Sequence, residues 1–288
     1  MADIGNFLDA DKTRIVDMID KVTTTKSLPR HYLGFSQLGE ECLRKLWFYF
    51  RHVAETEIDG RVNRIFTTGH NAEVFMIKDL EAIGVETWDT LDSQQGFSAI
   101  NNHCRGHSDG LAKNVPGAEK ALHVLEFKTS SDKLFKLVKK KGVKAEKPIH
   151  YAQMMLYAHF SGATRALYMV YNKNTSEYYT ERVNANEEFA KDLIFKAGLV
   201  IHSEDVNDFK RIGSGTPSFF KCRFCDFKEV CFNEVKAHKN CRTCVHADVL
   251  DDGKWGCSLH AIDDVSTENQ EKGCGSHDYL ACFGGESV

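Results

Sequence analysis

The fold is decided by residues 106–129, which read GHSDGLAKNVPGAEKALHVLEFKT. Pro116 and Gly117 suit the two central positions of a type II turn. The short run at 110–112 is therefore expected to pair back on the apolar run at 121–127. This stretch predicts a β-hairpin at the centre of the fold.

Two acids flank the hairpin, Asp109 before its turn and Glu126 at its far end. The pairing is expected to bring the two carboxylates side by side. Side chains two apart on a strand share a face, so Lys128 projects with Glu126 while Phe127 enters the core. Two carboxylates beside an ammonium suit a hard divalent cation with a phosphate held against it. The hairpin therefore predicts a cation and phosphate site.

The whole chain sets wider bounds. Its 288 residues can form one large domain, or one domain with an appendage. Nothing in it resembles a signal peptide or a membrane span. Eight of its ten cysteines follow residue 220, in close C-x-x-C spacings that favour metal ligation over disulfides in a reducing compartment. We therefore expect a cytoplasmic protein that does not associate with membranes.

Charge is unevenly distributed along the chain. The formal net charge of −4 argues against nonspecific coating of nucleic acid. Residues 105–150 nevertheless hold eleven Lys and Arg against five acids, whereas residues 232–288 hold five against ten. A run of charge is usually a solvated face, but the lysines of the first segment follow the hairpin directly and are expected to contact phosphate. The lysines predicted to bind DNA are Lys133, Lys136, Lys139, Lys140, Lys141 and Lys144.

Two further helices carry residues of interest. Ser36 can cap a helix over residues 37–51, which holds a lone Cys42. By itself that cysteine reads as a buried apolar residue. In a later helix, Gln153 and Tyr157 are four residues apart and share a face. A polar face on an otherwise apolar helix is a weak sign of a site.

A helix is also expected over residues 69–83, ending at Gly84. His70 and Glu73 stand at the start of its apolar stripe. Either they cap the helix end, or Glu73 reaches the same cation as the hairpin acids. Both interpretations stay open on the sequence alone.

The remaining segments predict an α/β fold. Residues 166–171 and 176–183 read as strands joined by a tight turn, and residues 187–203 as a long amphipathic helix. The strands are expected to be mainly antiparallel and interrupted by helices. We predict a mixed central sheet flanked by helices, with a small cysteine-rich metal-binding tail.

Four motifs now stand in order: G-x-x-x-E ending at Glu73, G-x-x-D ending at Asp109, E-x-K from Glu126, and Q-x-x-x-Y from Gln153. In order and rough spacing they resemble the RecB-like branch of the PD-(D/E)xK nuclease superfamily. The resemblance covers roughly residues 35–232 and implies a restriction-endonuclease-like core. It implies a metal-dependent DNA nuclease, commonly an exonuclease acting on DNA ends or single strands in recombination, repair or replication. A stand-alone chain without a helicase suggests a phage or mobile-element enzyme working in a bacterial host.

The resemblance also assigns roles within the site. It implies that Asp109, Glu126 and the backbone carbonyl of Phe127 hold Mg²⁺ or Mn²⁺. Lys128 would orient the attacking water or steady charge on the phosphate.

The two helical motifs would complete that site. Gln153 and Tyr157 would help to position the lysine and the DNA strand. Many members carry a histidine where this chain has Glu73, and His70 lies one turn earlier, so either residue can complete the metal site.

Iron-sulfur members of this branch, including the AddB nucleases and the CRISPR-adaptation nucleases, use one cysteine before the core and a C-x2-C-x5-C group after it. This chain matches with Cys42, Cys222, Cys225 and Cys231. The resemblance implies a 4Fe-4S cluster that clasps the two ends of the nuclease domain. The domain boundaries are then 1–232 for the nuclease and 233–288 for the tail.

The other cysteines allow two zinc arrangements. A C-x2-C-x15-C-x2-C group would use Cys222, Cys225, Cys241 and Cys244. This grouping would leave Cys42 and Cys231 without a role as metal ligands. The favoured zinc site is Cys241, Cys244, Cys257 and Cys274, with His246, His260, His277 and Cys282 as nearby substitutes. Cys104 is expected to be a core thiol.

A second hypothesis comes from another functional class. The chain would be a nucleic-acid-binding recombination partner with a vestigial nuclease site, and its zinc tail would recruit another protein. The presence of every charged motif residue speaks against it.

Overall fold

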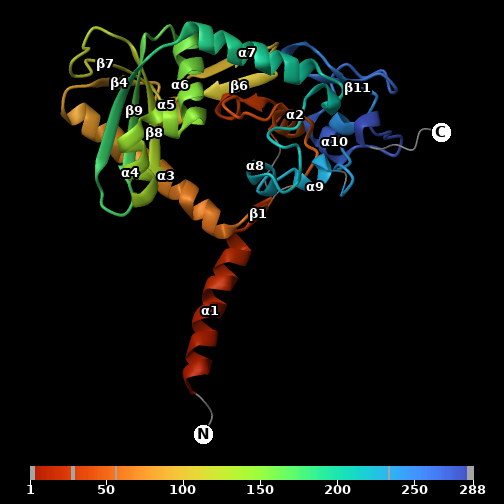
Figure 1. Cartoon of the computed structure of the whole chain (residues 1–288), viewed down its shortest axis with the longest axis horizontal. Coiled ribbons are helices and arrows are strands. Elements are labelled where there is room, and N and C mark those ends of the chain that lie inside the picture. The colour runs from red at the N-terminus through yellow and green to blue at the C-terminus, as the bar shows by residue number, and fades with distance from the viewer. Residues whose placement is uncertain (1–3, 27–29, 56, 233, 284–288) are drawn as a thin grey trace.

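The protein has a mixed α/β fold built on a five-stranded sheet, in the order β10-β9-β8-β7-β4 (Figure 1). The computed structural model describes residues 4–26, 30–55, 57–232 and 234–283. The sheet strands are β4 (Glu86–Trp88), β7 (Leu111–Lys113), β8 (His123–Ser130), β9 (Arg165–Asn172) and β10 (Tyr178–Asn184). The predicted fold class, a mixed sheet flanked by helices, is confirmed.

One pair of neighbouring strands is parallel and the other three pairs are antiparallel. β8 runs parallel to β9 over eight residues, from His123 opposite Arg165 to Ser130 opposite Asn172. A parallel pair needs a long crossover. Here the crossover is made by α4 (Asp132–Lys141), α5 (Val143–Glu146) and α6 (Pro148–Ser161).

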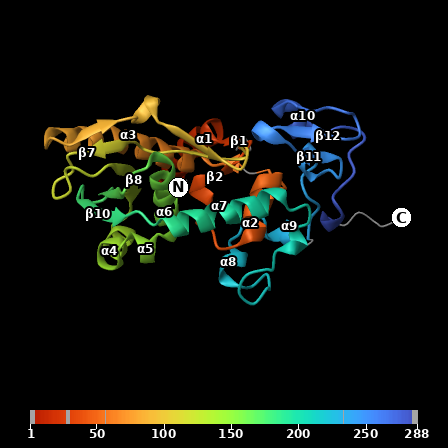
Figure 2. The same ribbon diagram turned by 90° about the horizontal axis from the view of Figure 1, so that it is seen from above.

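Helices cover both faces of this sheet. α3 (Gly60–Ala82) lies on one face, while α4, α5, α6 and α7 (Glu187–His202) lie on the other (Figure 2). Leu125 and Phe127 of β8 pack in the α3 layer, and Val124 packs in the α6 layer. The strand therefore turns its even-numbered side chains, including Glu126, toward α6.

The predicted hairpin is confirmed. β7 pairs antiparallel with β8, with Leu111 opposite Val124. The amide of Ala118 donates to the carbonyl of Val115 at 3.0 Å, which closes a turn around Pro116. Gly117 has φ 80°, the left-handed conformation that a type II turn requires at its third position.

Two predicted helix starts were wrong. α2 (Leu43–Arg51) begins at Cys42 rather than at Ser36, which lies in the separate 3-10 turn η1 (Phe35–Gln37). Between them Gly39 passes so close to α6 that a Cβ there would stand 2.4 Å from the Cα of Ile149, so the chain bends away before the helix starts.

The second error concerns α3, which begins at Gly60 rather than at residue 69. Its N-cap is Asp59, whose side chain accepts from the amide of Arg61 at 2.7 Å. The first half of α3 packs against the separate helix α1 (Ile4–Thr23) and is largely exposed, so it carries no apolar stripe that the sequence could show.

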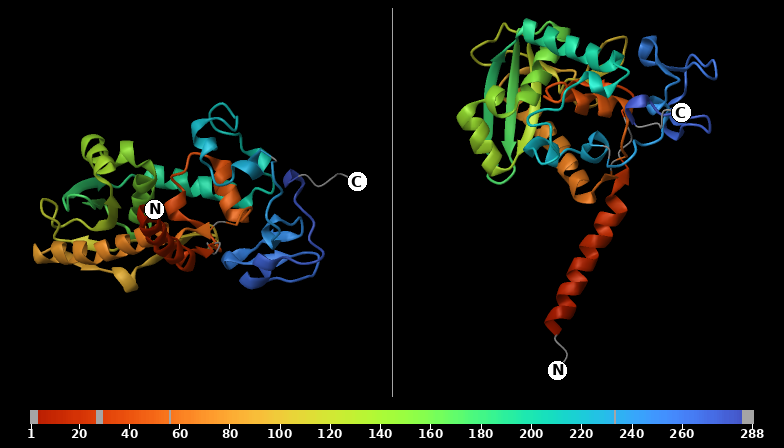
Figure 3. Two further views of the ribbon diagram at one scale, coloured as in Figure 1. Left: turned by 90° about the horizontal axis from the view of Figure 1, so that it is seen from below. Right: turned by 45° about the vertical axis from the view of Figure 1, so that its right-hand side comes forward.

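Smaller elements surround this core. α1 extends away from the body, and the C-terminal segment lies at the opposite end from the central sheet (Figure 3). The additional strands are β1 (Thr25–Lys26), β2 (Leu33–Gly34), β3 (Glu57–Ile58), β5 (Gly96–Ala99), β6 (Cys104–His107), β11 (Ala247–Val249) and β12 (Trp255–Cys257). The short helices are α8 (Phe220–Arg223), α9 (Lys228–Cys231) and α10 (Thr267–Lys272). The other 3-10 turns are η2 (Leu91–Ser93), η3 (Val206–Asp208), η4 (Cys241–Thr243), η5 (Asp251–Gly253) and η6 (Ala281–Phe283).

None of the described helices combines the length and apolar character needed to cross a membrane. β2, β5 and β6 form a three-stranded sheet beside the main one, in the order β2-β6-β5. This second sheet was not predicted, because its strands are too short to show a period in the sequence.

The packing of β8 against α3 gives a stability prediction. Leu125 is fully buried, so Leu125→Ala should lower the free energy of unfolding by about 2–5 kcal/mol through lost apolar contact and a cavity. The urea midpoint, measured with an unchanged slope, reports this loss. The matched variant Leu134→Ala truncates a leucine that is 39% exposed on α4 and should shift the midpoint little. Equal midpoints for the two variants would contradict this packing.

Candidate functional site

The centre of the site is the place where the ladder between β7 and β8 ends. The amide of Leu125 donates to the carbonyl of Gly110 at 2.9 Å. Two residues on, the amide of Phe127 donates instead to Oδ2 of Asp109 at 2.8 Å. The carboxylate thus takes the place of the next ladder carbonyl. In an extended strand the N–H and C=O of one residue point to the same edge, so the Phe127 carbonyl faces this edge as well.

Glu126 lies beside this edge with its carboxylate fully buried. Neither of its oxygens accepts a hydrogen bond within the described part of the chain. Nζ of Lys128 stands 2.5 Å from Oε1 as an ion pair. Burial raises the pKa of Glu126 to about 8, Lys128 opposes that rise, and Asp109 and Glu73 add to it. A buried carboxylate with a single ammonium partner is still costly, and a bound cation would relieve that cost.

The ammonium of Lys128 stands between the two hairpin acids, 3.8 Å from Oδ2 of Asp109. Burial opposes its charge, but Glu126 and Asp109 outweigh burial and raise the pKa of Lys128. No three Asp, Glu, His or Cys side chains of the described residues converge closely enough to hold one ion as they stand. At this site the reason is that the ammonium fills the position between the carboxylates.

α3 contributes Glu73 to the same electrostatic cluster. Burial and the neighbouring Asp109 raise the pKa of Glu73 to about 7. Its Oε1 accepts a hydrogen bond from Nε2 of Gln94 at 3.0 Å. His70 is exposed one turn earlier on the helix. Of the two helical candidates, Glu73 is the one whose charge acts on Glu126.

α6 brings the fourth motif to the site. Nε2 of Gln153 donates to the hydroxyl of Tyr157 at 3.4 Å, and both side chains are buried. Burial raises the pKa of Tyr157, and the charges of Glu126 and Asp109 raise it further. Its hydroxyl therefore stays protonated and able to donate beside the acids.

A cleft of about 440 Å³ opens in front of Lys128. Besides that lysine it is lined by Arg30, Tyr32, Phe35, Ser36, Arg105, Gly106, His107, Ile149, His150, Gln153 and Tyr157. Two arginines and a lysine with no acid among the lining residues make it a cleft for an anion.

Most of this basic lining was not predicted. Arg105 lies 5.7 Å from the ring centroid of Tyr32 and donates from Nε to the carbonyl of Asn102 at 2.7 Å. His150 bonds through Nδ1 to the hydroxyl of Tyr168 at 2.8 Å. Burial and then the charge of nearby Lys128 lower the pKa of His150 to about 3, so it is neutral near pH 7. One signal in the sequence could have indicated this basic lining. Arg105 directly precedes the G-x-x-D motif, and His107 lies within it.

The predicted DNA-binding lysines lie on α4 and α5, and all six are exposed. They do not line the cleft as the described residues define it. Nζ of Lys136 pairs with Asp132 at 2.7 Å, and Nζ of Lys141 pairs with Glu146 at 3.0 Å. Two of the six lysines are therefore already paired with acids on their own helices or the next one.

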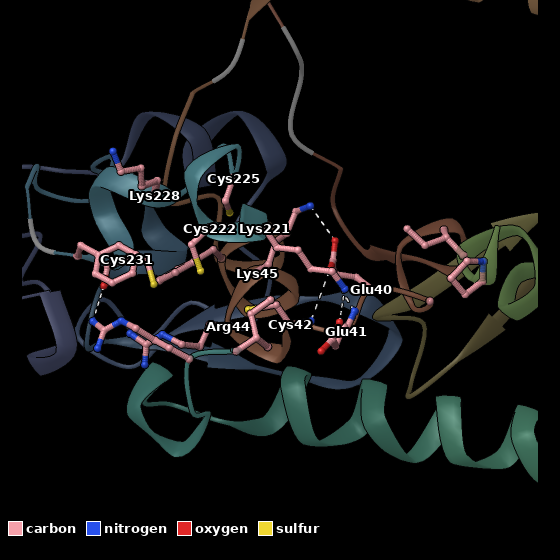
Figure 4. Close-up of a pocket in the computed structure, with 17 residues that line it drawn as sticks. Glu40, Glu41, Cys42, Arg44, Lys45, Lys221, Cys222, Cys225, Lys228 and Cys231 are labelled. Atoms are coloured by element: carbon pink, nitrogen blue, oxygen red, sulfur yellow. Dashed lines mark hydrogen bonds and ion pairs between the residues drawn. The ribbon is translucent and has the colours of Figure 1, made fainter. Parts of the chain in front are cut away.

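The four cysteines assigned to the cluster line a single pocket of about 460 Å³, although they come from three separate segments (Figure 4). Cys42 is the N-cap of α2, while Cys222 and Cys231 belong to α8 and α9, with Cys225 between them. Burial raises the pKa of Cys42, and the neighbouring Cys231 adds to this effect. The basic side chains around the pocket are Arg44, Lys45, Arg211, Lys221 and Lys228. Glu40 and Glu41 also line the pocket and pair with Lys45 and Lys221, which leaves basic residues in excess. Four thiols lining one wide pocket are compatible with an iron-sulfur cluster.

The tail cysteines are placed differently. Cys241, Cys244, Cys257 and Cys274 line a second cavity of only about 20 Å³, together with His246, His260 and His277. The alternative zinc group, which joins Cys222 and Cys225 to Cys241 and Cys244, is divided between the two cavities. Cys104 is fully buried in β6, where burial raises the pKa of its thiol.

Comparison with known proteins gives remote likenesses only. No protein-family model matches the chain, and no curated protein matches it. An alkaline exonuclease from Laribacter hongkongensis is 13% identical, with a TM-score of 0.45, and the match covers 60% of this chain and 87% of that one. Its complex with dAMP gives a TM-score of 0.42 at the same identity, covering 59% and 86%. The protein SSO0001 also matches at 13% identity with a TM-score of 0.42, covering 72% and 88%. Similarities this remote do not indicate what activity this chain has.

The raised pKa values of Glu73 and Glu126 predict a pH dependence of stability. Both lie above the ordinary glutamate value, so between about pH 4.5 and 8 the folded protein holds protons that the unfolded chain releases. In metal-free buffer the free energy of unfolding should therefore fall as pH rises through this window. Urea unfolding at several pH values in EDTA measures this slope.

Glu126→Gln should flatten that slope, because glutamine does not titrate. The control is Glu188→Gln on the exposed surface of α7, which should keep the slope of the parent protein. If Glu126→Gln unfolds with the same pH dependence as the parent, Glu126 is not the buried proton-binding group.

Proposed function

We propose that this protein is a metal-dependent DNA nuclease. The observation that carries the proposal is the fully buried carboxylate of Glu126, whose one close partner among the described residues is the ammonium of Lys128, and which stands near Asp109 where the β7–β8 ladder ends. Both acids lie at the edge to which the Phe127 carbonyl points. Carboxylate and carbonyl oxygens are the ligands that Mg²⁺ and Mn²⁺ prefer.

The chain's own residues have distinct roles in hydrolysis. Asp109, Glu126 and the Phe127 carbonyl hold the cation, with Glu73 completing the set from α3. Once bound, the cation supplies Lewis acidity and lowers the pKa of a coordinated water. Lys128, whose side chain is 28% exposed and lines the cleft, would orient the attacking water or steady charge on the phosphate.

The cleft supplies the nucleic-acid contacts. Arg30, Arg105 and Lys128 are donors along one wall, and Tyr157 keeps its proton for a phosphate oxygen or water. Ammonium and guanidinium contacts to phosphate carry no base information, so cleavage should be independent of sequence. The exposed lysines of α4 and α5 extend the attraction beyond the cleft.

The finer assignments are also proposals. The resemblance of the four motifs to RecB-like nucleases, among which exonucleases acting on DNA ends or single strands are commonest, favours an exonuclease working in recombination, repair or replication. We further propose that Cys42, Cys222, Cys225 and Cys231 hold a 4Fe-4S cluster with a structural purpose. Their convergence on one basic pocket supports it.

The activity prediction concerns the two acids and the lysine. Asp109→Asn, Glu126→Gln and Lys128→Met should each reduce DNA cleavage at least about a hundredfold, because each removes a charge that acts on the cation or the phosphate. The assay uses 5′- and 3′-end-labelled single- and double-stranded DNA with Mg²⁺, Mn²⁺ or EDTA. The pattern of labelled products then reports end dependence and direction.

Glu188→Gln serves as the matched control and should cleave at the parent rate. Circular dichroism must show that each inactive variant is folded. Two results would contradict the proposed metal-dependent nuclease activity. One is DNA cleavage that persists in EDTA, and the other is cleavage at the parent rate by both Asp109→Asn and Glu126→Gln.

The cluster prediction is independent of activity. Protein purified without air should be brown and contain iron and sulfide, and Cys42→Ser should lose both, because one of the four thiolates is gone. Cys104→Ser, which changes a thiol outside the pocket, should keep its iron. A colourless parent protein that contains only zinc would rule out the cluster.

A further inference from the structure

The C-terminal segment, residues 234–283, has little core of its own. Its sheet is the single pair β11 and β12, with three residues in each strand. Trp255 of β12 is fully buried, but it packs on Phe50 of α2 with ring centroids 5.2 Å apart. A two-stranded ribbon and a short helix do not fold stably without a further constraint. The segment therefore needs something besides apolar burial.

Four thiols from separate places in this segment meet at one cavity. Cys241 and Cys244 are held at the ends of η4, where the amide of Cys244 donates to the carbonyl of Cys241 at 3.0 Å. Cys257 ends β12, and Cys274 follows α10. Their common cavity of about 20 Å³ has room for one water-sized particle. That size fits a single ion.

A second observation points independently to an anion here. Arg242, inside the C-x2-C turn, is 1% exposed, and Arg51 of α2 is 2% exposed. Their hydrogen-bond acceptors are neutral: Arg242 donates to Gln270 and to the carbonyls of Phe50 and His31, at 2.9, 3.1 and 3.1 Å. Arg51 donates to the carbonyls of Arg242 and Ser203, at 3.2 and 3.1 Å.

Neither arginine forms an ion pair with a carboxylate in the described ranges. Only longer-range attraction acts on them, from Cys282 and then Glu204 on Arg51, and from Glu271 and then Cys241 on Arg242. Both guanidinium groups lie over the ring of Trp255, with Cζ 4.7 Å from its centroid for Arg242 and 5.2 Å for Arg51. Two buried cations sharing one aromatic ring repel each other, and buried charge is costly without a counter-charge.

We infer that Cys241, Cys244, Cys257 and Cys274 bind one Zn²⁺ ion, and that the buried guanidinium of Arg242 balances part of the charge of this site. Four neutral thiols carry no charge to offset the guanidinium, whereas four thiolates on Zn²⁺ form a dianion. The ion then cross-links the segment, while the hydrogen bonds of Asn240 and Arg242 hold it on the C-terminal end of α2.

The remaining donors are less suited to the ion. Nε2 of His277 lies 3.2 Å from the hydroxyl of Thr243, and Nε2 of His260 lies 3.8 Å from Sγ of Cys274. As they stand, the thiols are not converged on one point in the described chain. Uncharged thiols have no reason to converge, and a shared ion at about 2.3 Å from each sulfur draws them together.

The first test is elemental analysis of the full chain. Purified protein should contain one zinc per chain, counted separately from any iron. Titration of the thiols with an organomercurial, with a zinc-binding dye present, should release this zinc from the folded protein. Cys257→Ser should lose it, and Cys282→Ser, which changes another half-buried thiol of the same segment, should retain it. A parent protein without zinc, or zinc loss in Cys282→Ser with retention in Cys257→Ser, overturns the proposal.

The charge balance is tested separately, because a cysteine variant can fail for lack of folding. Arg242→Gln should release zinc to a competing chelator at least about tenfold more readily than the parent, and Arg242→Lys should restore most of the affinity. Equal zinc affinity in Arg242→Gln and the parent overturns the role of the arginine. None of these measurements depends on nuclease activity.

Discussion

The hydrogen bond from the Phe127 amide to Asp109 is the constraint on which the candidate site depends. It forms where the ladder between β7 and β8 stops, so β8 continues with one edge free of a strand neighbour. That free edge exposes the Phe127 carbonyl, and the same bond fixes the carboxylate of Asp109 beside it. Strand alternation then assigns Glu126 and Lys128 to the α6 face. The hydrogen bond therefore fixes Asp109 beside the Phe127 carbonyl, and strand alternation places Glu126 and Lys128 next to them.

The electrostatics of this site explain why its parts come from different layers. Glu126 is buried by α6 and the sheet, so its charge is costly unless a cation meets it. Lys128 supplies that cation in the free protein, and Glu73 approaches from α3 on the other side of the sheet. The cluster holds three acids against one lysine, and the pKa values of Glu73 and Glu126 are raised first by burial and further by the neighbouring acids. A divalent ion would relieve this repulsion more fully than a proton does, because it can serve several carboxylates at once.

The hairpin, the type II turn and the α/β class were predictable, since each follows from local chemistry: Pro116 and Gly117 in the turn, and alternation along β8. The helix starts were not, because a bend at Gly39 depends on α6, which lies more than a hundred residues away. The basic cleft was missed for a similar reason. Arg30 and Arg105 reach it from two segments whose proximity only the β2–β6 pairing creates. The motif residues were identifiable, but their partners across the fold, such as Gln94 for Glu73, carry no sequence signal.

Helix α2 lies between the two cysteine-lined cavities and also contacts the part of the fold that forms the candidate site. Its N-cap, Cys42, lines the wide pocket, whereas at its other end the Arg51 and His52 carbonyls accept from the side chain of Asn240, next to the small cavity. Between these ends Trp47 donates to the carbonyl of Ser203 at 2.8 Å, which ties α2 to the end of α7. α2 also contacts β2, whose partner β6 carries Arg105 into the cleft. Only the wide pocket joins α2 to a distant segment through cysteines, because Cys42 lines it together with Cys222, Cys225 and Cys231. A group bound there would close a loop of many residues onto this short helix and so constrain the entropy of the unfolded chain. The small cavity is lined within residues 241–277, and its segment reaches α2 through hydrogen bonds instead.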